Sequence, residues 1–142
     1  MRPTTHAIIS ASISTGLIYF LKSYPAALAC FLSGVFIDID HYLDYFLARK
    51  KFTTYKELNE FCDHDTNWKL YLFFHSYELI LLFWWAIFYW NLNLFWGGIA
   101  IGMTTHMICD QFANPIKPLA YLFIYRWKYK FAQDKILTRI LK

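Results

Sequence analysis

The sequence predicts an all-α fold, a polytopic membrane helical bundle with about four transmembrane helices plus a C-terminal interfacial helix. The 142 residues are 58% hydrophobic and 22% aromatic, which is too apolar for an ordinary soluble domain of this size. A hydrocarbon core about 30 Å thick requires roughly 20 apolar residues per helix. Four segments approach that length within a single membrane domain, residues 1–142, and they predict spans at about 6–22, 25–41, 70–90 and 94–112.

The distribution of basic residues predicts the orientation of the spans. With four spans, every Lys and Arg except Lys22 falls on the side that holds the N-terminus. Cytoplasmic loops carry such an excess, so we predict a bacterial inner (plasma) membrane protein with cytoplasmic N- and C-termini. The formal charge of +4 is interpreted as this topology signal. No nucleic-acid partner is expected, because no recognition motif accompanies the basic residues.

The first two predicted spans form a helical hairpin with polar residues at its cytoplasmic end. His6 opens the first span, which we interpret as a retained helix because only Arg2 precedes it as a basic residue, too little for a signal peptide. The second span closes with Asp38, Asp40 and His41. On a helix Asp38 and His41 share a face, whereas at an unwound end Asp38 and Asp40 point the same way. Either geometry concentrates two carboxylates and an imidazole within one turn.

The predicted cytoplasmic loop, residues 42–69, contains a capping-box pattern. Thr54 and Glu57 stand three residues apart, so a short helix is expected to begin there. The following run Cys62-Asp63-His64-Asp65 is interpreted as a solvated loop rather than a ligand set. The three cysteines show no paired spacing and are expected to be free and reduced, and they are Cys30, Cys62 and Cys109.

The third and fourth predicted spans each contain a histidine followed by a carboxylate. His75 and Glu78 are three residues apart, so they are expected to share a helical face. A buried carboxylate without a partner costs about 2.5 kcal/mol or more in hydrocarbon, which makes it a functional candidate. His106 and Asp110 are four residues apart, which puts both side chains on one face about 6 Å apart along the axis.

The depth of the two histidines predicts that the polar residues meet. His75 lies roughly 8 Å and His106 roughly 9 Å from the cytoplasmic end of its span, at 1.5 Å per residue. A tight turn joins the two spans, so the helices are expected to be adjacent and antiparallel, with the histidines at one level. Five further residues are expected near the same cytoplasmic end of the helical bundle, namely His6, Asp38, Asp40, His41 and Asp110.

Such a set of side chains is typical of a metal site. Imidazole nitrogens and carboxylate oxygens are ligands for Zn²⁺ and other borderline divalent metals, and neighbouring carboxylates can bridge two ions. More than four mixed ligands predict a catalytic site for one or two divalent ions, with zinc as the first choice. A structural zinc knuckle is not expected because the chain lacks a Cys₂ pair, and a serine hydrolase is not expected because it lacks a G-x-S-x-G elbow.

The C-terminal stretch, residues 119–142, is predicted to form one final helix. Apolar residues alternate in it with six basic residues. A basic amphipathic helix after the last span is typical of an anchor in the cytoplasmic headgroup layer, where its charge favours anionic lipid. A role in partner binding or substrate steering is the alternative.

Four short motifs occur in a fixed order along the chain. They are an early His6, the run FIDIDH at residues 36–41, His75-Ser76, and HMICD at residues 106–110 followed by Asn114-Pro115 and Pro118. In this order they resemble the YdjM/YbcI family of membrane-bound metal-dependent hydrolases, whose motifs are an early His, P-D-I-D-H, H-R-G-x-T-H-S, and H-x-x-x-D before a T-P-x-G-like turn. The resemblance covers most of the chain.

The resemblance implies a metal-dependent hydrolase and a set of site residues. Ile37 departs from the family proline, and Leu70 and Tyr71 stand where the family has the first His and the Arg of its third motif. His64 or Glu78 is a hypothetical replacement for that missing histidine. The residues that the resemblance places in the metal site are His6, Asp38, Asp40, His41, His75, His106 and Asp110.

The leading prediction is therefore an integral-membrane hydrolase that cleaves an ester or phosphoester of a lipid or lipid-like substrate at the cytoplasmic leaflet. Glu78 and Asp40 are the candidate catalytic residues, with Glu78 as general base or as a group that orients a ligand. Membrane lipids are the expected partners, and a homo-oligomer or a membrane complex is left open. The alternative is a non-enzymatic metal- or proton-handling subunit, since His and carboxylate chains also form relays. A third reading, an iron-dependent lipid oxygenase, would need denser H-x-x-H repeats.

Overall fold

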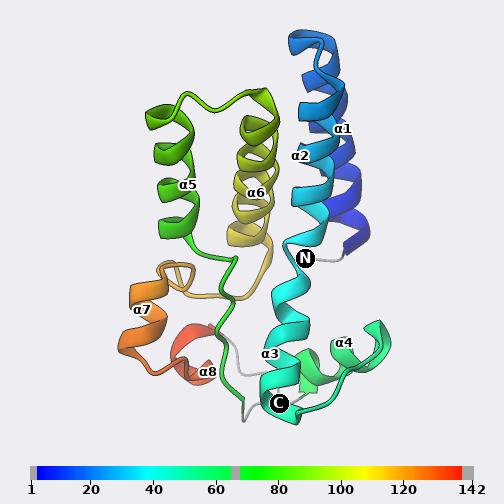
Figure 1. Cartoon of the computed structure of the whole chain (residues 1–142). Coiled ribbons are helices and arrows are strands. Elements are labelled where there is room, and N and C mark those ends of the chain that lie inside the picture. Colours follow the sequence, from blue (N-terminus) through cyan, green and yellow to red (C-terminus); the bar gives the residue numbers. More distant parts are fainter. Residues whose placement is uncertain (1–2, 65–67, 139–142) are drawn as a thin grey trace. The chain divides into compact units, whose positions relative to one another are not determined.

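The computed structural model describes residues 3–64 and 68–138, and it confirms the all-α class for them (Figure 1). Within these ranges the only β-pairing consists of two isolated bridges, Lys69–Ala132 and Ile116–Leu137. The helices are α1 (Pro3–Leu21), α2 (Tyr24–Phe36), α3 (Ile39–Arg49), α4 (Tyr55–His64), α5 (Tyr77–Tyr89), α6 (Leu94–Ala113), α7 (Phe123–Lys128) and α8 (Gln133–Ile136).

The chain divides into two compact units. Unit 1 comprises Met1–Ile37 and Tyr77–Asn114, and unit 2 comprises Asp38–Ser76 and Pro115–Lys142. Unit 1 therefore holds α1, α2, α5 and α6, whereas unit 2 holds α3, α4, α7 and α8. Each unit is assembled from two separate stretches of the sequence.

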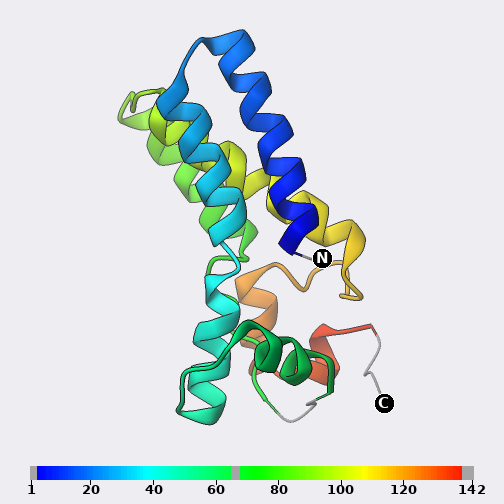
Figure 2. The same ribbon diagram turned by 90° about the vertical axis from the view of Figure 1, so that its right-hand side faces the viewer.

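In unit 1, small residues bring α2 close to α6. Gly98 and Gly102 stand four residues apart on α6, and a Cβ atom at either position would collide with the backbone of Ala26 or Cys30 on α2. Close backbone approach of this kind is how small-xxx-small helix pairs gain packing and hydrogen bonds. Because the two backbones are close, Ser33 Oγ on α2 can donate a hydrogen bond to a carbonyl oxygen of α6 at 3.0 Å. Figure 2 shows α1 and α2 as an antiparallel pair joined by a short turn.

We expect Gly102→Ala to destabilise unit 1 by about 1–3 kcal/mol, because the new methyl group would push against the Cys30 carbonyl and Ser33 Oγ. Gly97→Ala is the matched control, since a Cβ atom there meets nothing within 4 Å. The control should be neutral or slightly stabilising, because alanine has the higher helix propensity. Thermal unfolding in detergent measures both variants. Equal midpoints for the two would contradict the packing argument.

Side-chain hydrogen bonds tie α5 to α6 within the same unit. Tyr77 Oη donates to Gln111 Oε1 at 3.0 Å, and Trp84 Nε1 donates to Thr104 Oγ1 at 3.0 Å. Between an apolar helix pair, such bonds satisfy donors that would otherwise be costly to bury. They fix the register of the two antiparallel helices.

Two helices are long and apolar enough to cross a membrane, Pro3–Leu21 with 19 residues and Tyr24–Arg49 with 26 residues. The predicted span at 25–41 lies within the second of these helices, in which a turn at Ile37 and Asp38 separates α2 from α3 while both residues keep right-handed helical backbone angles. The predicted span at 70–90 is wrong over residues 70–76, which are not helical. Helix α5 has only 13 residues, a rise of about 20 Å. The fourth predicted span is a helix, Leu94–Ala113.

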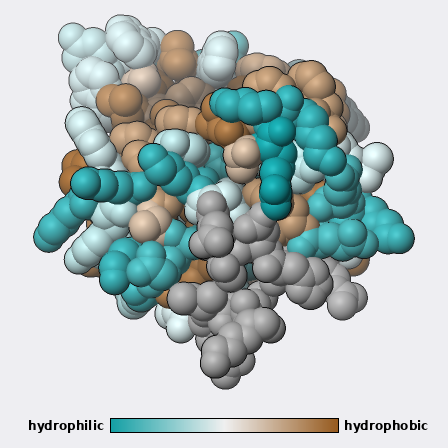
Figure 3. All heavy atoms as spheres, turned by 90° about the horizontal axis from the view of Figure 1, so that it is seen from below, coloured by the Kyte–Doolittle hydropathy of each residue, from teal (hydrophilic) through white to brown (hydrophobic). Residues whose placement is uncertain are grey.

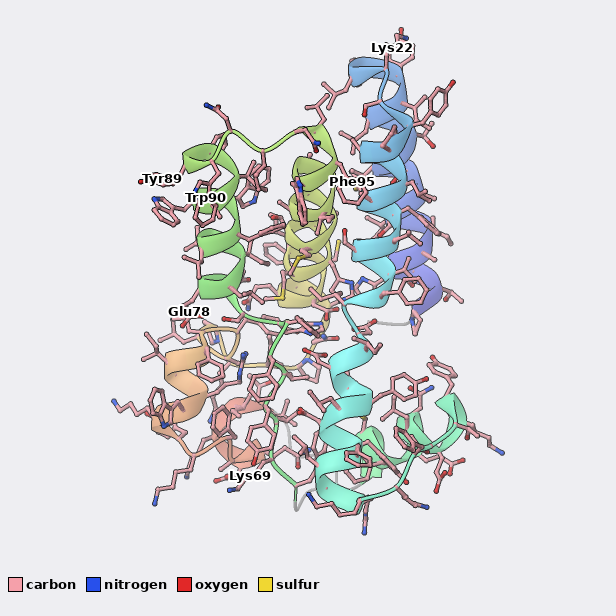
Figure 4. All side chains as sticks on the ribbon, viewed as in Figure 1. Lys22, Lys69, Glu78, Tyr89, Trp90 and Phe95 are labelled. Carbon is pink, nitrogen blue, oxygen red and sulfur yellow. The ribbon has the colours of Figure 1, made fainter. Side chains whose placement is uncertain are left out.

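Unit 1 has few charges and many exposed apolar side chains. Among its described residues Lys22, Glu78 and Asp110 are the only Asp, Glu, Lys or Arg. Figure 4 places Lys22 at the turn between α1 and α2, and Glu78 at the opposite end of α5 from Tyr89 and Trp90. Large side chains on α5 are more than half exposed, namely Leu81, Leu82, Trp85, Phe88 and Tyr89. Such a surface is typical of a helix pair that faces lipid.

Unit 2 has a small hydrophobic core and a charged surface. Eight buried residues from α3, α4, α8 and the segments near 70 and 120 form the core, and they are Tyr45, Leu58, Phe61, Trp68, Leu70, Leu72, Ala120 and Ile136. Hydrophilic side chains gather on the face seen in Figure 3. The exposed basic residues of this unit include Arg49, Lys50, Lys51, Lys56, Lys69, Lys128, Lys130 and Lys135.

The helix predicted to begin at Thr54 is confirmed, with one of the two hydrogen bonds of a capping box. The Glu57 backbone N–H donates to Thr54 Oγ1 at 3.4 Å, and α4 begins at Tyr55. Lys51 donates to Glu57 at 2.6 Å and Thr53 donates at 2.8 Å. These hydrogen bonds hold the pKa of Glu57 below its usual value. Cys30, Cys62 and Cys109 form no disulfide bond with one another.

The predicted single C-terminal helix is wrong. Its described part forms two short helices, α7 and α8, separated by Lys130 and Phe131, whose φ angles are 53° and 60°. Left-handed backbone at non-glycine residues ends a right-handed helix. Two long-range backbone bonds hold the strained turn and the tail in place, Leu70 N–H to Phe131 O at 3.0 Å and Thr138 N–H to Pro115 O at 2.9 Å. Residues 139–142 lie outside the described part of the chain.

Candidate metal centre

The predicted metal residues divide between the two units. His6 on α1 and His106 and Asp110 on α6 lie in unit 1, and the remaining four lie in unit 2. Those four are Asp38 at the N-cap position of α3, Asp40 and His41 in the first turn of α3, and His75 just before α5. Within each unit the residues meet in one cluster. The expectation that all seven converge on a single site stays a prediction.

The unit 1 cluster brings together side chains from α1 and α6. The Asp110 carboxylate contacts both imidazoles, with Oδ1 3.0 Å from His6 Nε2 and Oδ2 3.4 Å from His106 Nε2. All three residues are at most 2% exposed. The four-residue spacing therefore places His106 and Asp110 next to each other on α6, as predicted, and α1 contributes His6 to the cluster.

The protonation of His106 follows from its partner on α2. His106 Nδ1 lies 2.8 Å from the Gly34 carbonyl oxygen, which can only accept a hydrogen bond, so Nδ1 carries the proton. In a neutral imidazole the lone pair is then on Nε2, which faces Asp110. A lone pair and a carboxylate repel each other unless a cation or proton lies between them. Metal-binding histidines have this arrangement, with the second ring nitrogen donating to a backbone carbonyl.

His6 has a different geometry from His106. The two imidazole rings are stacked, with centroids 3.7 Å apart and planes 12° apart. Stacked rings cannot both direct an in-plane lone pair at one ion, because the ion would lie roughly half the ring spacing outside each plane. His6 is therefore placed to contact the Asp110 carboxylate rather than to share an ion with His106. Its Nε2 atom lies 3.0 Å from Asp110 Oδ1, but the contact does not have hydrogen-bond geometry.

The unit 2 cluster is built around His75. Asp40 Oδ2 lies 3.0 Å from His75 Nδ1 and also accepts the backbone N–H groups of Phe74 at 3.0 Å and His75 at 3.3 Å. With Nδ1–H donated to a carboxylate, the His75 lone pair is on Nε2, and Nε2 lies 3.4 Å from Asp38 Oδ1. This repeats the His106 arrangement, since a fixed acceptor takes Nδ1–H and a carboxylate oxygen faces Nε2.

This cluster could hold a metal ion, although its identity is not defined by the residues. Asp40, His41 and His75 each offer a ligand atom within 4.8 Å of the other two. Asp38 Oδ1 also lies 3.7 Å from His41 Nε2. Zinc–ligand distances of 2.0–2.2 Å place two ligands of a tetrahedral ion about 3.4 Å apart, which is close to the spacing of the His75–Asp38 pair.

Two expectations about the third predicted span are corrected. His75 is not on a helix, so it does not share a helical face with Glu78, and its predicted depth of about 8 Å does not apply. Glu78 is half-buried in the first turn of α5, where a carboxylate interacts favourably with the helix dipole. His64 was the other hypothetical replacement, and its side chain lies outside the described part of the structure.

Sequence reasoning missed two residues that build the His75 environment. Asp44 is 1% exposed, and its Oδ2 accepts the backbone N–H groups of Tyr71 at 2.9 Å and Leu72 at 3.2 Å. Arg126 is fully buried and donates to three carbonyls in unit 2. The spacing of Asp40 and Asp44, four residues apart on α3, was a signal for the first. The sequence contains no comparable signal for Arg126.

Comparison of the chain with family models, curated proteins and solved structures finds no match in any of the three. The resemblance to the YdjM/YbcI family therefore stays a prediction.

Proposed function

We propose that this chain is an integral-membrane metal-dependent hydrolase that cleaves an ester or phosphoester bond of a lipid or lipid-like substrate. The observation that carries the proposal is the repeated histidine arrangement. In both units a fixed acceptor takes the Nδ1 proton and a carboxylate oxygen lies 3.4 Å from Nε2, at His106 and at His75. Second-sphere acceptors of this kind orient imidazoles for metal binding.

The membrane location is supported by the partition of charge between the units. Unit 1 exposes large apolar side chains and has three charged residues in its described part, whereas the exposed basic residues of unit 2 would suit the aqueous side. We propose that α1, α2, α5 and α6 lie in the bilayer, with unit 2 on the cytoplasmic side. The basic residues of unit 2 then follow the positive-inside rule. A site reached from the bilayer favours a substrate with acyl chains.

The proposed roles of the residues follow from their contacts. Asp38, His41 and His75 would hold a divalent ion, of which zinc fits the mixed N/O donors, and Asp40 would keep the His75 ring in position. In unit 1, His106 and Asp110 would supply metal ligands. A bound divalent ion supplies a Lewis acid and lowers the pKa of water. Glu78 remains our candidate general base, as the one further carboxylate of unit 1.

We expect the protein purified in detergent without chelator to retain stoichiometric divalent metal and to release fatty acid or phosphate from native lipid extracts. Removal of the metal with a chelator should abolish hydrolysis, and zinc should restore it. Elemental analysis and lipid mass spectrometry measure the two properties.

The outcomes separate the proposal from its main alternative. Bound metal without hydrolysis of any lipid class would favour a non-enzymatic metal-handling subunit. Hydrolysis that survives complete removal of the metal would contradict metal dependence. Absence of bound metal after purification and after zinc addition would overturn both readings and leave a proton-relay or packing role for the histidines.

A further inference from the structure

The loop that carries His75 has no helical hydrogen bonds over most of its length, so its backbone groups need other partners. Four of its N–H groups are taken by two carboxylates of α3. Asp44 Oδ2 accepts two of them, at residues 71 and 72, and Asp40 Oδ2 accepts two more, at residues 74 and 75. This side of the loop is therefore fixed by acceptors from α3.

The carbonyl side of the same loop is fixed by Arg126 of α7. Its Nη1 donates to His75 O at 2.8 Å and to Ala120 O at 2.8 Å, and its Nη2 donates to Leu72 O at 3.0 Å. Arg126 is 0% exposed. A buried guanidinium is costly unless hydrogen bonds and opposite charge compensate it, and the Asp44 carboxylate interacts electrostatically with it. The loop is thus held between α3 and α7.

We propose that Arg126 is the positioning residue of His75: by holding the carbonyls of Leu72 and His75, it keeps the His75 ring directed toward Asp38. The consequence for metal binding rests on the proposed function, whereas the consequence for the loop does not. A lysine cannot replace it, because an ammonium on a flexible stem lacks the planar fork that reaches several carbonyls in fixed directions. A small displacement of the His75 backbone would move Nε2 away from its 3.4 Å separation from Asp38 Oδ1.

The first test measures the loop itself in the full-length protein. We expect Arg126→Lys to increase amide hydrogen exchange at residues 70–76 by about 10-fold or more, and to broaden or split the His75 signal in ¹⁵N-histidine NMR spectra. Lys128→Gln is the matched control, because Lys128 lies on the same short helix and is exposed. Unchanged exchange and an unchanged His75 signal in Arg126→Lys would overturn the proposal. Arg126→Gln, which keeps an amide donor, provides a second variant if the lysine variant does not fold.

The second test measures zinc affinity of the same variants. Arg126→Lys should weaken zinc binding by about 10–100-fold, the usual effect of losing a group that orients a ligand, while Lys128→Gln binds zinc like the unmodified chain. Looser exchange at 70–76 together with unchanged zinc affinity and an unchanged His75 signal would show a purely structural Arg126 and overturn the proposal. An unmodified chain that binds no zinc would refute the proposed function alone, and the exchange and NMR data would still decide the role of Arg126.

Discussion

Purified His106→Ala is expected to contain less than a tenth of the metal found in the unmodified protein and to lose hydrolysis in parallel. His106 Nε2 faces Asp110 Oδ2 at 3.4 Å, and removal of a metal ligand should weaken binding by about 100-fold or more, beyond the effect of second-sphere changes. The Gly34 carbonyl would lose its donor, at a cost of about 1–3 kcal/mol. Elemental analysis of the folded, inserted variant is the measurement.

The control for His106→Ala is Cys109→Ala on the same helix. Cys109 is a free, half-buried thiol, so this variant should keep its metal and its activity. Detergent size-exclusion profiles show whether both variants insert and fold. Normal metal content in a folded His106→Ala protein would remove His106 from the site.

Replacement of Asp40 by alanine is expected to have the largest effect on stability, about 3–5 kcal/mol. Its Oδ2 atom accepts two backbone N–H groups and contacts His75 Nδ1. The substitution would remove this acceptor from all three donors, although the His75 backbone N–H also donates to Leu72 O at 3.1 Å. Asp40→Asn keeps an acceptor oxygen, so we expect it to fold but to bind zinc about 10–100-fold more weakly. Thermal unfolding and zinc titration in detergent measure the two effects.

Asp38→Asn separates folding from metal binding in the same cluster. The Asp38 side chain is partly exposed, at 25%, whereas Asp40 is fully buried and accepts two backbone N–H groups. Its substitution should leave the unfolding midpoint nearly unchanged while weakening zinc binding. A large loss of stability in Asp38→Asn, or none in Asp40→Ala, would contradict the roles derived from the contacts.

The elements that could be predicted from the sequence are those specified by local residues. The composition of residues 94–113 is enough to predict the helix Leu94–Ala113. The four-residue spacing of His106 and Asp110 then places both side chains on one face of it. The Thr54–Glu57 pattern likewise marks the start of α4. In these cases neighbours in the sequence determine the structure.

The loop at residues 70–76 could not be predicted because distant residues determine its conformation. Its apolar composition suits a helix or a buried extended segment equally well. The deciding hydrogen bonds come from Asp40 and Asp44, 34 and 28 residues earlier for Phe74 and Leu72. Periodicity within a window of ten or twenty residues contains no information about such partners.

The burial of Arg126 was hidden for a similar reason. Within residues 119–142 it stands among five other basic residues, and nothing local distinguishes it from the exposed Lys128 and Lys130. Only the tertiary contacts with the carbonyls of Leu72 and His75 do so. The candidate ligands were therefore visible in the sequence, whereas the groups that orient them were not.

The long separation between His75 and Arg126 also sets an order of events during synthesis. The ribosome delivers Arg126 51 residues after His75, at a few to twenty residues per second. Until it arrives, the carbonyls of Leu72 and His75 have no guanidinium to bind. Under the proposed function, the first helices would enter the bilayer before the His75 ring is fixed, and capture of an ion by that cluster would follow insertion.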